Sequence, residues 1–441
     1  MKRAMEQQFD VRARRFKPYP EYRDSGVEWL GIIPAHWDVK RLKQTASIND
    51  DALPESADPD LVLMYVDIAG VDSTNGIVGK EPLTFAKAPS RARRQVRHGD
   101  VVVSCVRTYL RAIAPIVDPE PNLVVSTGFA VVRPRGQLVS AFAAYALRAT
   151  YFVERIVAHS TGVSYPAINA SEMATFRLAL PPEPEQRAIA TFLDRETGKI
   201  DALVAKKERL IELLQEKRTA LITRAVTKGL DPNVPMKDSG VEWLGDIPAH
   251  WVVARVQHVA KIINGYPFDS ARFTLDQGLP LIRIRDLYST STEVFYDGAE
   301  VREAVVMPGE VLIGMDGDFN IGLWRGLRAL LNQRMCCLRS GSSDLDKFLA
   351  YVLPFPLKIT NSLTFSTTVK HLSSHDVAKI RVGLPPTGEL EMILDHLDAA
   401  VSRTNRLLER ISHGIDRLKE VRTALISAAV TGKIDVREEA G

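Results

Sequence analysis

Side chains that can hydrogen-bond to nucleic-acid bases and phosphates gather in a few short stretches of this 441-residue chain. Arginine can make two hydrogen bonds to guanine, while lysine, serine and threonine commonly hold phosphates. The candidates in the first half are Arg91, Arg93, Arg94 and Arg97, then Arg107, Tyr109 and Arg111, and finally Thr161, Ser164 and Tyr165 in the hydroxyl-rich loop 159–166. Alternate residues of a strand share a face, so we expect Arg107, Tyr109 and Arg111 to point the same way.

The second half offers a comparable set of candidates. They are Tyr266, Arg283, Arg285, Asp316, Asp318, Arg325 and Arg328, together with Thr367, Thr368 and Lys370 in the loop 365–371. We place Arg283 and Arg285 on one face of a strand. The alternative for each residue is an ordinary surface charge or a turn, because charged side chains are mostly exposed in any case. The clusters are therefore better candidates than their individual members.

Motifs of catalysis and metal binding are missing from the sequence. The segment 70–80 lacks the spacing of a phosphate-binding loop, and both Pro-Pro pairs follow leucine instead of the Asn or Asp of an adenine methyltransferase motif. The acidic residues between 50 and 60 lie in a proline-containing segment and are expected to be solvated. Only three cysteines are present, Cys105, Cys336 and Cys337, too few for a disulfide framework. We predict no catalytic residue, no metal site and no cofactor in this chain.

The composition is that of an ordinary globular protein, with 45% hydrophobic and 25% charged residues. The formal net charge of +3 is small, and the basic excess falls in the first half. The basic N-terminal segment has no apolar centre, and no apolar run is long enough to span a bilayer. We therefore expect a cytoplasmic protein of two to four domains with no membrane association.

The chain contains an internal duplication. Residues 24–36, DSGVEWLGIIPAH, recur as DSGVEWLGDIPAH at 238–250, with a single difference. A second pair of similar segments, 181–229 and 385–433, shares a Pro-Pro start and the sequence RTALI. We call these four segments the repeated frame. Two divergent modules lie between its parts, which suggests two units of one architecture and different detail.

Both later segments of the repeated frame are predicted to be long helices. Apolar residues recur at alternating spacings of three and four, among them Leu193, Leu203 and Leu210 in the first and Leu397 and Leu407 in the second. This spacing is typical of a coiled-coil seam, and each helix has its duplicate available as a partner. The alternative is that each helix packs only on its own module as an amphipathic helix.

The two modules are predicted to be α+β. Segments rich in β-branched residues, bounded by Gly, Pro or Asp, indicate strands at 61–68, 99–106, 123–134, 279–287 and 309–315. Helices are expected around 139–157 and 346–353. The domains expected are a first module at 1–180, a helix at 181–229, a second module at 230–384, a helix at 385–435 and a tail at 436–441.

These features together resemble the specificity subunits of type I restriction-modification systems. The resemblance rests on the GVEWLGxIPAHW openings, on segments 89–115 and 124–134 of the first module, on 264–287 and 307–326 of the second, and on the Pro-Pro helix starts. It covers nearly the whole chain. The second helix has Glu389-Leu390 where the first has Glu185-Gln186, a departure that could tune which partner surface the helix meets.

The resemblance implies two target recognition domains joined by two long helices in an antiparallel coiled coil. Each domain would read one half of a bipartite, asymmetric site in double-stranded DNA. The helices would set the spacer and dock two adenine methyltransferase subunits, with restriction-translocase subunits joining outside. S-adenosylmethionine, ATP and magnesium would then belong to the partner subunits.

Two other interpretations of these patterns exist. A coiled-coil scaffold that binds only proteins would suit the repeated frame, but it does not explain why the modules diverge while the frame stays alike. The matched Trp29, Trp37, Trp243 and Trp251 could stack on bases. Residues shared by both modules cannot explain two specificities, so we predict a structural role for them and for the matched His36 and His250.

Overall fold

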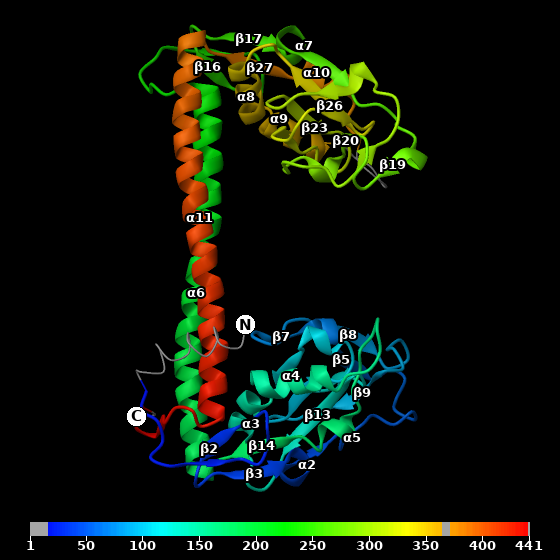
Figure 1. Cartoon of the computed structure of the whole chain (residues 1–441), viewed down its shortest axis with the longest axis vertical. Coiled ribbons are helices and arrows are strands. Elements are labelled where there is room, and N and C mark those ends of the chain that lie inside the picture. The colour runs from blue at the N-terminus through cyan, green and yellow to red at the C-terminus, as the bar shows by residue number, and fades with distance from the viewer. Residues whose placement is uncertain (1–15, 364–370, 440–441) are drawn as a thin grey trace. The chain divides into compact units, whose positions relative to one another are not determined.

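The computed structural model describes residues 16–363 and 371–439, and the chain divides into two compact units (Figure 1). Unit 1 comprises residues 1–207 and 413–441, and unit 2 comprises residues 208–412. The limits of the units fall within two long helices, α6 (Glu183–Lys228) and α11 (Thr387–Val430). The domain boundaries inferred from the sequence stay a prediction. The predicted site residues Thr367, Thr368 and Lys370 lie outside the described residues.

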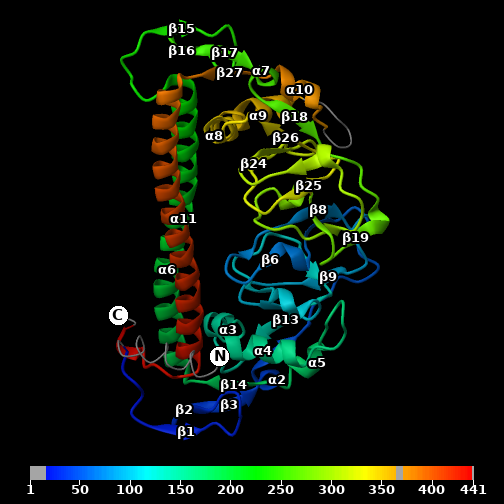
Figure 2. The same cartoon turned by 45° about the horizontal axis from the view of Figure 1, so that its top comes forward.

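Each unit contains a segment of α6 beside a segment of α11 (Figures 1 and 2). In unit 1, Arg422 Nε donates to Asp201 Oδ1 at 2.9 Å, and Lys207 lies next to Gly414. In unit 2, Arg218 donates to Asn405 Oδ1 at 2.7 Å. Within unit 1, residue numbers rise along α6 from Asp201 to Lys207 while those of their partners on α11 fall from Arg422 to Gly414. These two segments are therefore antiparallel.

The predicted seam is partly wrong. Leu203, Leu210 and Leu407 are 44%, 44% and 41% exposed. At each of these positions the half-buried residue is the next one along the chain: Val204, Ile211 and Leu408. Other predicted positions, such as Leu214, Ile411 and Leu418, are half-buried. The polar pairs Asp201–Arg422 and Arg218–Asn405 also link the two helices. Leu203, Leu210 and Leu407 lie on an outer face.

In its described residues, unit 1 contains two four-stranded sheets, short ribbons and four short helices. One sheet has the order β11 (Ile113–Pro115), β10 (Val101–Ser104), β13 (Phe129–Pro134), β4 (Ala46–Ile48), and the other the order β8 (Glu81–Thr84), β5 (Val62–Val66), β12 (Leu123–Ser126), β9 (Ala92–Gln95). The ribbons are β1 (Tyr22–Asp24) with β2 (Ile32–Pro34), β3 (Asp38–Arg41) with β14 (Arg177–Leu180), and β6 (Val71–Asp72) with β7 (Gly76–Ile77). The helices are α2 (Leu42–Thr45), α3 (Ser140–Ala146), α4 (Thr150–Ala158) and α5 (Ala170–Met173).

Unit 2 repeats this plan. Its sheets have the orders β18 (Lys261–Asn264), β26 (Met335–Arg339), β23 (Val311–Gly314), β24 (Ile321–Leu323), and β19 (Phe273–Thr274), β21 (Phe295–Tyr296), β20 (Leu279–Ile282), β25 (Ala329–Leu331), β22 (Val305–Val306). The ribbons are β15 (Met236–Asp238) with β16 (Asp246–Pro248), and β17 (Val252–Arg255) with β27 (Arg381–Leu384). The helices are α7 (Val256–Val259), α8 (Ser343–Val352), α9 (Pro354–Leu363) and α10 (Ser374–Lys379).

The mixed helix and strand content agrees with the sequence, but three predicted elements differ. The segment 123–134 is two strands in different sheets, because Thr127 and Gly128 form a turn between β12 and β13. The helix expected at 139–157 is broken between Ala146 and Thr150 into α3 and α4. The strand expected over 279–287 ends at Ile282, where the chain turns into a 3-10 helix at Ile284–Asp286.

The core of unit 1 lies on both faces of the β10 sheet. Val101 and Val103 pack toward α3, α4 and the repeated frame, whereas Val102 packs with Val66 and Val125 of the second sheet. Alternate residues of a strand point to opposite faces, and burial on both faces explains the continuous Val-Val-Val run. The same arrangement in unit 2 places Leu312 between its two sheets. No helix in the described parts of the chain is long and apolar enough to cross a membrane.

A glutamate, buried in unit 1 and half-buried in unit 2, holds the start of each long helix against a tryptophan of the repeated frame. In unit 1, Glu185 accepts from Trp37 Nε1 at 3.0 Å and Tyr19 Oη at 2.5 Å, and it lies 2.8 Å from His36 Nε2. In unit 2, Glu389 accepts from Trp251 Nε1 at 3.0 Å and lies 2.6 Å from His250 Nε2. Trp37 and Trp251 are buried, which supports the structural role predicted for them.

The residues after these glutamates are also internal. Gln186 is fully buried and bonds to the backbone of Gln137, Val139 and Pro181, while Leu390 packs in the core of unit 2. The suggestion that this difference tunes a partner surface is therefore wrong, because both side chains face their own unit.

Candidate nucleic-acid interface

The loop that follows β10 carries the predicted residues Arg107, Tyr109 and Arg111. These residues do not lie on a strand as predicted: Thr108–Leu110 is a 3-10 helix, and Arg107 and Arg111 both have φ of 53°. Such left-handed backbone turns are uncommon for residues other than glycine. The strand prediction was wrong because the left-handed Arg107 ends the extended backbone and turns the chain. Tyr109 is 55% exposed at the tip of this loop.

The loop 159–167 lies directly against the loop after β10. Val106 and Thr161 both form β-bridges with Ala167, and the hydroxyl groups of Thr108 and Ser160 lie 2.8 Å apart. Two predicted stretches that are distant in sequence are thus brought together.

Side chains of both loops reach one another at this exposed edge. The Arg107 guanidinium lies 5.0 Å from the centre of the Tyr165 ring. Thr161 and Ser164 are exposed in the same loop, and Tyr165 is 61% exposed. A guanidinium, two phenols and two hydroxyl groups therefore face solvent together, a set suited to base edges and phosphates.

The arginines around β9 divide into two groups. Arg91 pairs with Asp67 at 2.9 Å and Arg97 with Asp51 at 2.8 Å, and Arg93 lies over the Phe85 ring. Arg94 differs, because its Nε is buried without a hydrogen-bond partner. Burial raises the pKa of the Cys105 thiol, just before the loop, to about 11, an effect that the nearby Arg94 partly opposes. Arg94 is thus the member of the group that lies near the loop.

Unit 2 places Arg283 and Arg285 on either side of the start of a 3-10 helix, not on one strand face. Arg283 Nη2 lies 3.3 Å and Arg285 Nη1 3.2 Å from the same Glu293 carboxylate. The buried Asp286 accepts the backbone N–H of Arg283 and ends the strand at this point. The physical reason for the error is this cap, which a pattern of β-branched residues does not reveal.

The counterpart of the Arg107 loop in unit 2 is the loop 315–320 between β23 and β24. Asp316 accepts from His371 Nδ1 at 2.7 Å and pairs with Arg334 at 3.2 Å. Tyr288, which is 73% exposed, donates to Asn320 Oδ1 at 3.4 Å. The exposed amide of Asn320 suits adenine, and the half-buried carboxylate of Asp316 suits cytosine, better than either suits guanine.

Sequence reasoning missed Asn320, Tyr288 and Arg334. Aligning GDVVVSC at 99–105 with GEVLIGM at 309–315 would have placed both loops at matched positions and pointed to them.

The other candidates of unit 2 are more dispersed. Arg328 pairs with Glu300 at 2.6 Å, and Arg325 lies near Tyr351 on the side of the repeated frame. Tyr266 is 46% exposed and contacts Phe268 edge-on at 5.1 Å. Asp318 lies in the loop 315–320 itself. Within the described residues, no group of three or more His, Cys, Asp or Glu side chains is placed to hold a metal ion.

The chain thus consists of two similar units, and each carries an exposed polar loop on a common scaffold. The family model described as the type I restriction modification DNA specificity domain matches residues 34–213 and again 248–417, which together are most of the chain. The chain belongs to this specificity-domain family. Both copies of the domain include a divergent module and most of the long helix after it.

Individual relatives of the specificity-domain family agree with this assignment. The type I restriction enzyme EcoBI specificity subunit of Escherichia coli is 36% identical over 199 residues, which span 45% of this chain and 42% of that protein. The match thus covers less than half the length of that relative. The MjaIX specificity subunit of Methanocaldococcus jannaschii is 21% identical over 96% of this chain and 99% of its own length.

Solved structures share the fold of this specificity-domain chain. A chain from a structure of a type I restriction-modification system, described in terms of complex assembly and conformational transition, matches with a TM-score of 0.73 and 22% identity. It covers 90% of this chain and 98% of its own length. The HsdS subunit of Thermoanaerobacter tengcongensis matches with a TM-score of 0.50 over 91% of this chain and 98% of its own length, also at 22% identity.

Proposed function

We propose that this chain is the non-catalytic DNA-recognition subunit of a type I restriction-modification complex, in which each unit reads one half of a bipartite site. The observation that carries the proposal is the contrast between frame and loops. The two units share their tryptophan–glutamate contacts and ribbons, yet the matched loops carry Arg107 and Tyr109 in unit 1 but Asp316 and Asn320 in unit 2. Different loops on a common scaffold are what two different half-sites require.

The two long helices are proposed to form an antiparallel coiled coil that fixes the distance between the half-sites. The antiparallel contacts within unit 1 support this arrangement, as do the continuous hydrogen-bonded helices that enter both units. The unread spacer of the DNA site would then be set by helix length, at about 1.5 Å for each residue.

Partner subunits are proposed to dock on the outer faces of the helices. Leu210 and Leu213 of α6 are 44% and 45% exposed, and Leu407 of α11 is 41% exposed, within a stretch otherwise dominated by polar residues. Residues three or four apart share a helix face, and exposed apolar residues there suit a protein partner. Two adenine methyltransferase subunits are the proposed partners, with restriction-translocase subunits outside them. S-adenosylmethionine, ATP and magnesium are proposed to bind those partners.

Methylation mapping tests the proposed function directly. A host that carries this chain with its methyltransferase partner is expected to show adenine methylation at one two-part motif. Deleting this chain should abolish methylation at that motif, and re-expression should restore it. The proposal fails if no two-part motif depends on the chain.

Replacing both Leu210 and Leu213 by aspartate is expected to disrupt assembly with the methyltransferase subunits. The change places two charges in an apolar contact, where unpaired charges are costly to desolvate. Size-exclusion chromatography with multi-angle scattering should show free subunits in place of the complex.

The matched control is Glu212→Lys and Glu216→Lys on the same helix, which changes charge but no apolar contact. If both double variants assemble like the unaltered chain, this face is not the docking surface.

A further inference from the structure

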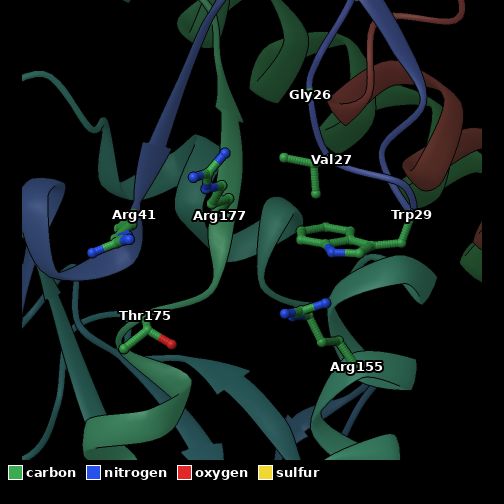
Figure 3. Close-up of a pocket in the computed structure, with 7 residues that line it drawn as sticks. All are labelled: Gly26, Val27, Trp29, Arg41, Arg155, Thr175 and Arg177. Carbon is green, nitrogen blue, oxygen red and sulfur yellow. The ribbon is translucent and has the colours of Figure 1, made fainter.

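A cationic pocket of about 400 Å³ lies in unit 1 (Figure 3). It lies outside the loop 105–112 that follows β10, which we call the candidate reading loop. Arg41 and Arg177 come from directly paired positions of the ribbon β3–β14, so their side chains leave the same face. Arg155 comes from α4, and its guanidinium lies beneath the Trp29 ring (Figure 3). Thr175 adds a hydroxyl group, and none of the lining residues is acidic. The pocket therefore concentrates positive charge.

The three guanidinium groups have no carboxylate within 4.0 Å among the described residues, unlike Arg91 and Arg97 of the same unit. Arg155 is held instead by aromatic rings, 4.9 Å from the Trp29 centre and 4.7 Å from the Phe176 centre. Its Nε is buried without a hydrogen-bond partner. The rings hold the Arg155 guanidinium in place without neutralising it, so its positive charge remains available to an anion in the pocket.

The repeated frame builds a pocket at the matched place in unit 2. Trp29 stacks on Tyr151 at 5.2 Å in unit 1, and Trp243 packs on Phe355 at 5.9 Å in unit 2. This second pocket is also lined by Lys379 and Arg381. Two differences change the charge of this second pocket: Ile359 stands where unit 1 has Arg155, and the acidic Asp376 lines the pocket. The stronger cationic site is therefore in unit 1.

We propose that the unit 1 pocket binds phosphate groups of the DNA backbone and holds the duplex independently of its sequence. The inference rests on the proposed function and extends it from base reading to backbone clamping. The planar guanidinium group of arginine can donate two hydrogen bonds to the oxygens of one phosphate. The positive charge of three such groups without an acidic neighbour is more than one carboxylate can neutralise. Consecutive backbone phosphates supply that charge.

The position of the pocket favours DNA over an acidic segment of a partner protein. Arg111 of the candidate reading loop donates to Glu154 at 2.6 Å, and Glu154 precedes Arg155 on α4. One helix thus links the loop proposed to read bases with the pocket proposed to hold phosphates. We therefore expect a duplex that contacts the loop to run its backbone near this helix.

The test measures binding of the reconstituted complex to two fluorescent duplexes of equal length, between 50 and 200 mM salt. One duplex carries the motif found by methylation mapping and the other a scrambled sequence. Arg155→Ile copies the residue of the matched pocket, so the fold tolerates it in its counterpart. Arg177→Gln alters only an exposed side chain, and Arg187→Gln on α6 is the charge-matched control.

Both pocket variants are expected to bind both duplexes about tenfold more weakly, with the slope of log K against log salt reduced by about one. The control should bind like the unaltered chain. Unchanged binding by both variants overturns the pocket proposal, as does a loss confined to assembly with the methyltransferase subunits. If the unaltered complex shows no preference for the motif duplex, the proposed function fails instead.

Discussion

The Arg107→Ala variant is expected to lose discrimination at one half of the bipartite site while it keeps the other half. Arg107 lies at an exposed loop where the Tyr165 ring supports its guanidinium at 5.0 Å. A bidentate contact between arginine and a base contributes about 1–3 kcal/mol of discrimination, which corresponds to about tenfold to a hundredfold. Competition binding with duplexes altered in one half-site at a time measures this change.

The matched control for Arg107 is Arg135→Ala. Arg135 follows β13 at the opposite end of the same sheet and pairs with Asp50 at 2.6 Å. The Arg135→Ala substitution removes one positive charge from the same unit, as Arg107→Ala does, without altering the loop after β10. If Arg107→Ala weakens binding to all duplexes equally, the residue contacts phosphate and our assignment to base reading is wrong. A change at both half-sites would contradict the division of reading between the two units.

Replacing Glu185 by alanine is expected to destabilise unit 1 by about 3 kcal/mol, because two buried donors would lose their acceptor. These donors are Trp37 Nε1 and Tyr19 Oη. Burial, together with the hydrogen bond to Glu185, raises the pKa of Tyr19, so its hydroxyl remains a donor. Glu185→Gln keeps an oxygen acceptor and is expected to cost less. Chemical unfolding followed by tryptophan fluorescence measures the difference.

Unit 2 provides an internal comparison for this effect. The Glu389 side chain is 20% exposed against 6% for Glu185, and it contacts the side chains of His250 and Trp251. Glu389→Ala should therefore destabilise unit 2 less than Glu185→Ala destabilises unit 1. Equal losses would show that the third partner, Tyr19, contributes little.

The features that were predicted well from the sequence are those that repeat. The helix expected at 181–229 is α6, and Trp37 and Trp251 of the repeated frame are in the cores, because a duplicated pattern is checked against its own copy. Strand segments within the modules were also found where β-branched residues run continuously, as in β10. These signals depend on local composition and period, which the sequence displays directly.

The parts that could not be predicted depend on single backbone angles and on contacts between distant residues. The left-handed Arg107 and Arg111 change a strand into a turn, and the Asp286 cap does the same near Arg283. The loop after β10 and the loop 159–167 are joined by backbone β-bridges to Ala167, and an alanine side chain does not reveal such contacts in the sequence. The pocket around Arg155 joins α4, a ribbon and the repeated frame, so its members are scattered along the chain.

In the sequence, unit 2 is inserted between the two parts of unit 1, and this order has a consequence for biosynthesis. Unit 2 is one continuous stretch of chain, whereas the core of unit 1 includes Ile426, Val430 and Val436 from beyond it. Domains fold as their residues leave the ribosome. Unit 1, although it begins first, cannot complete its core until the last helix has emerged, so unit 2 can reach its final packing earlier.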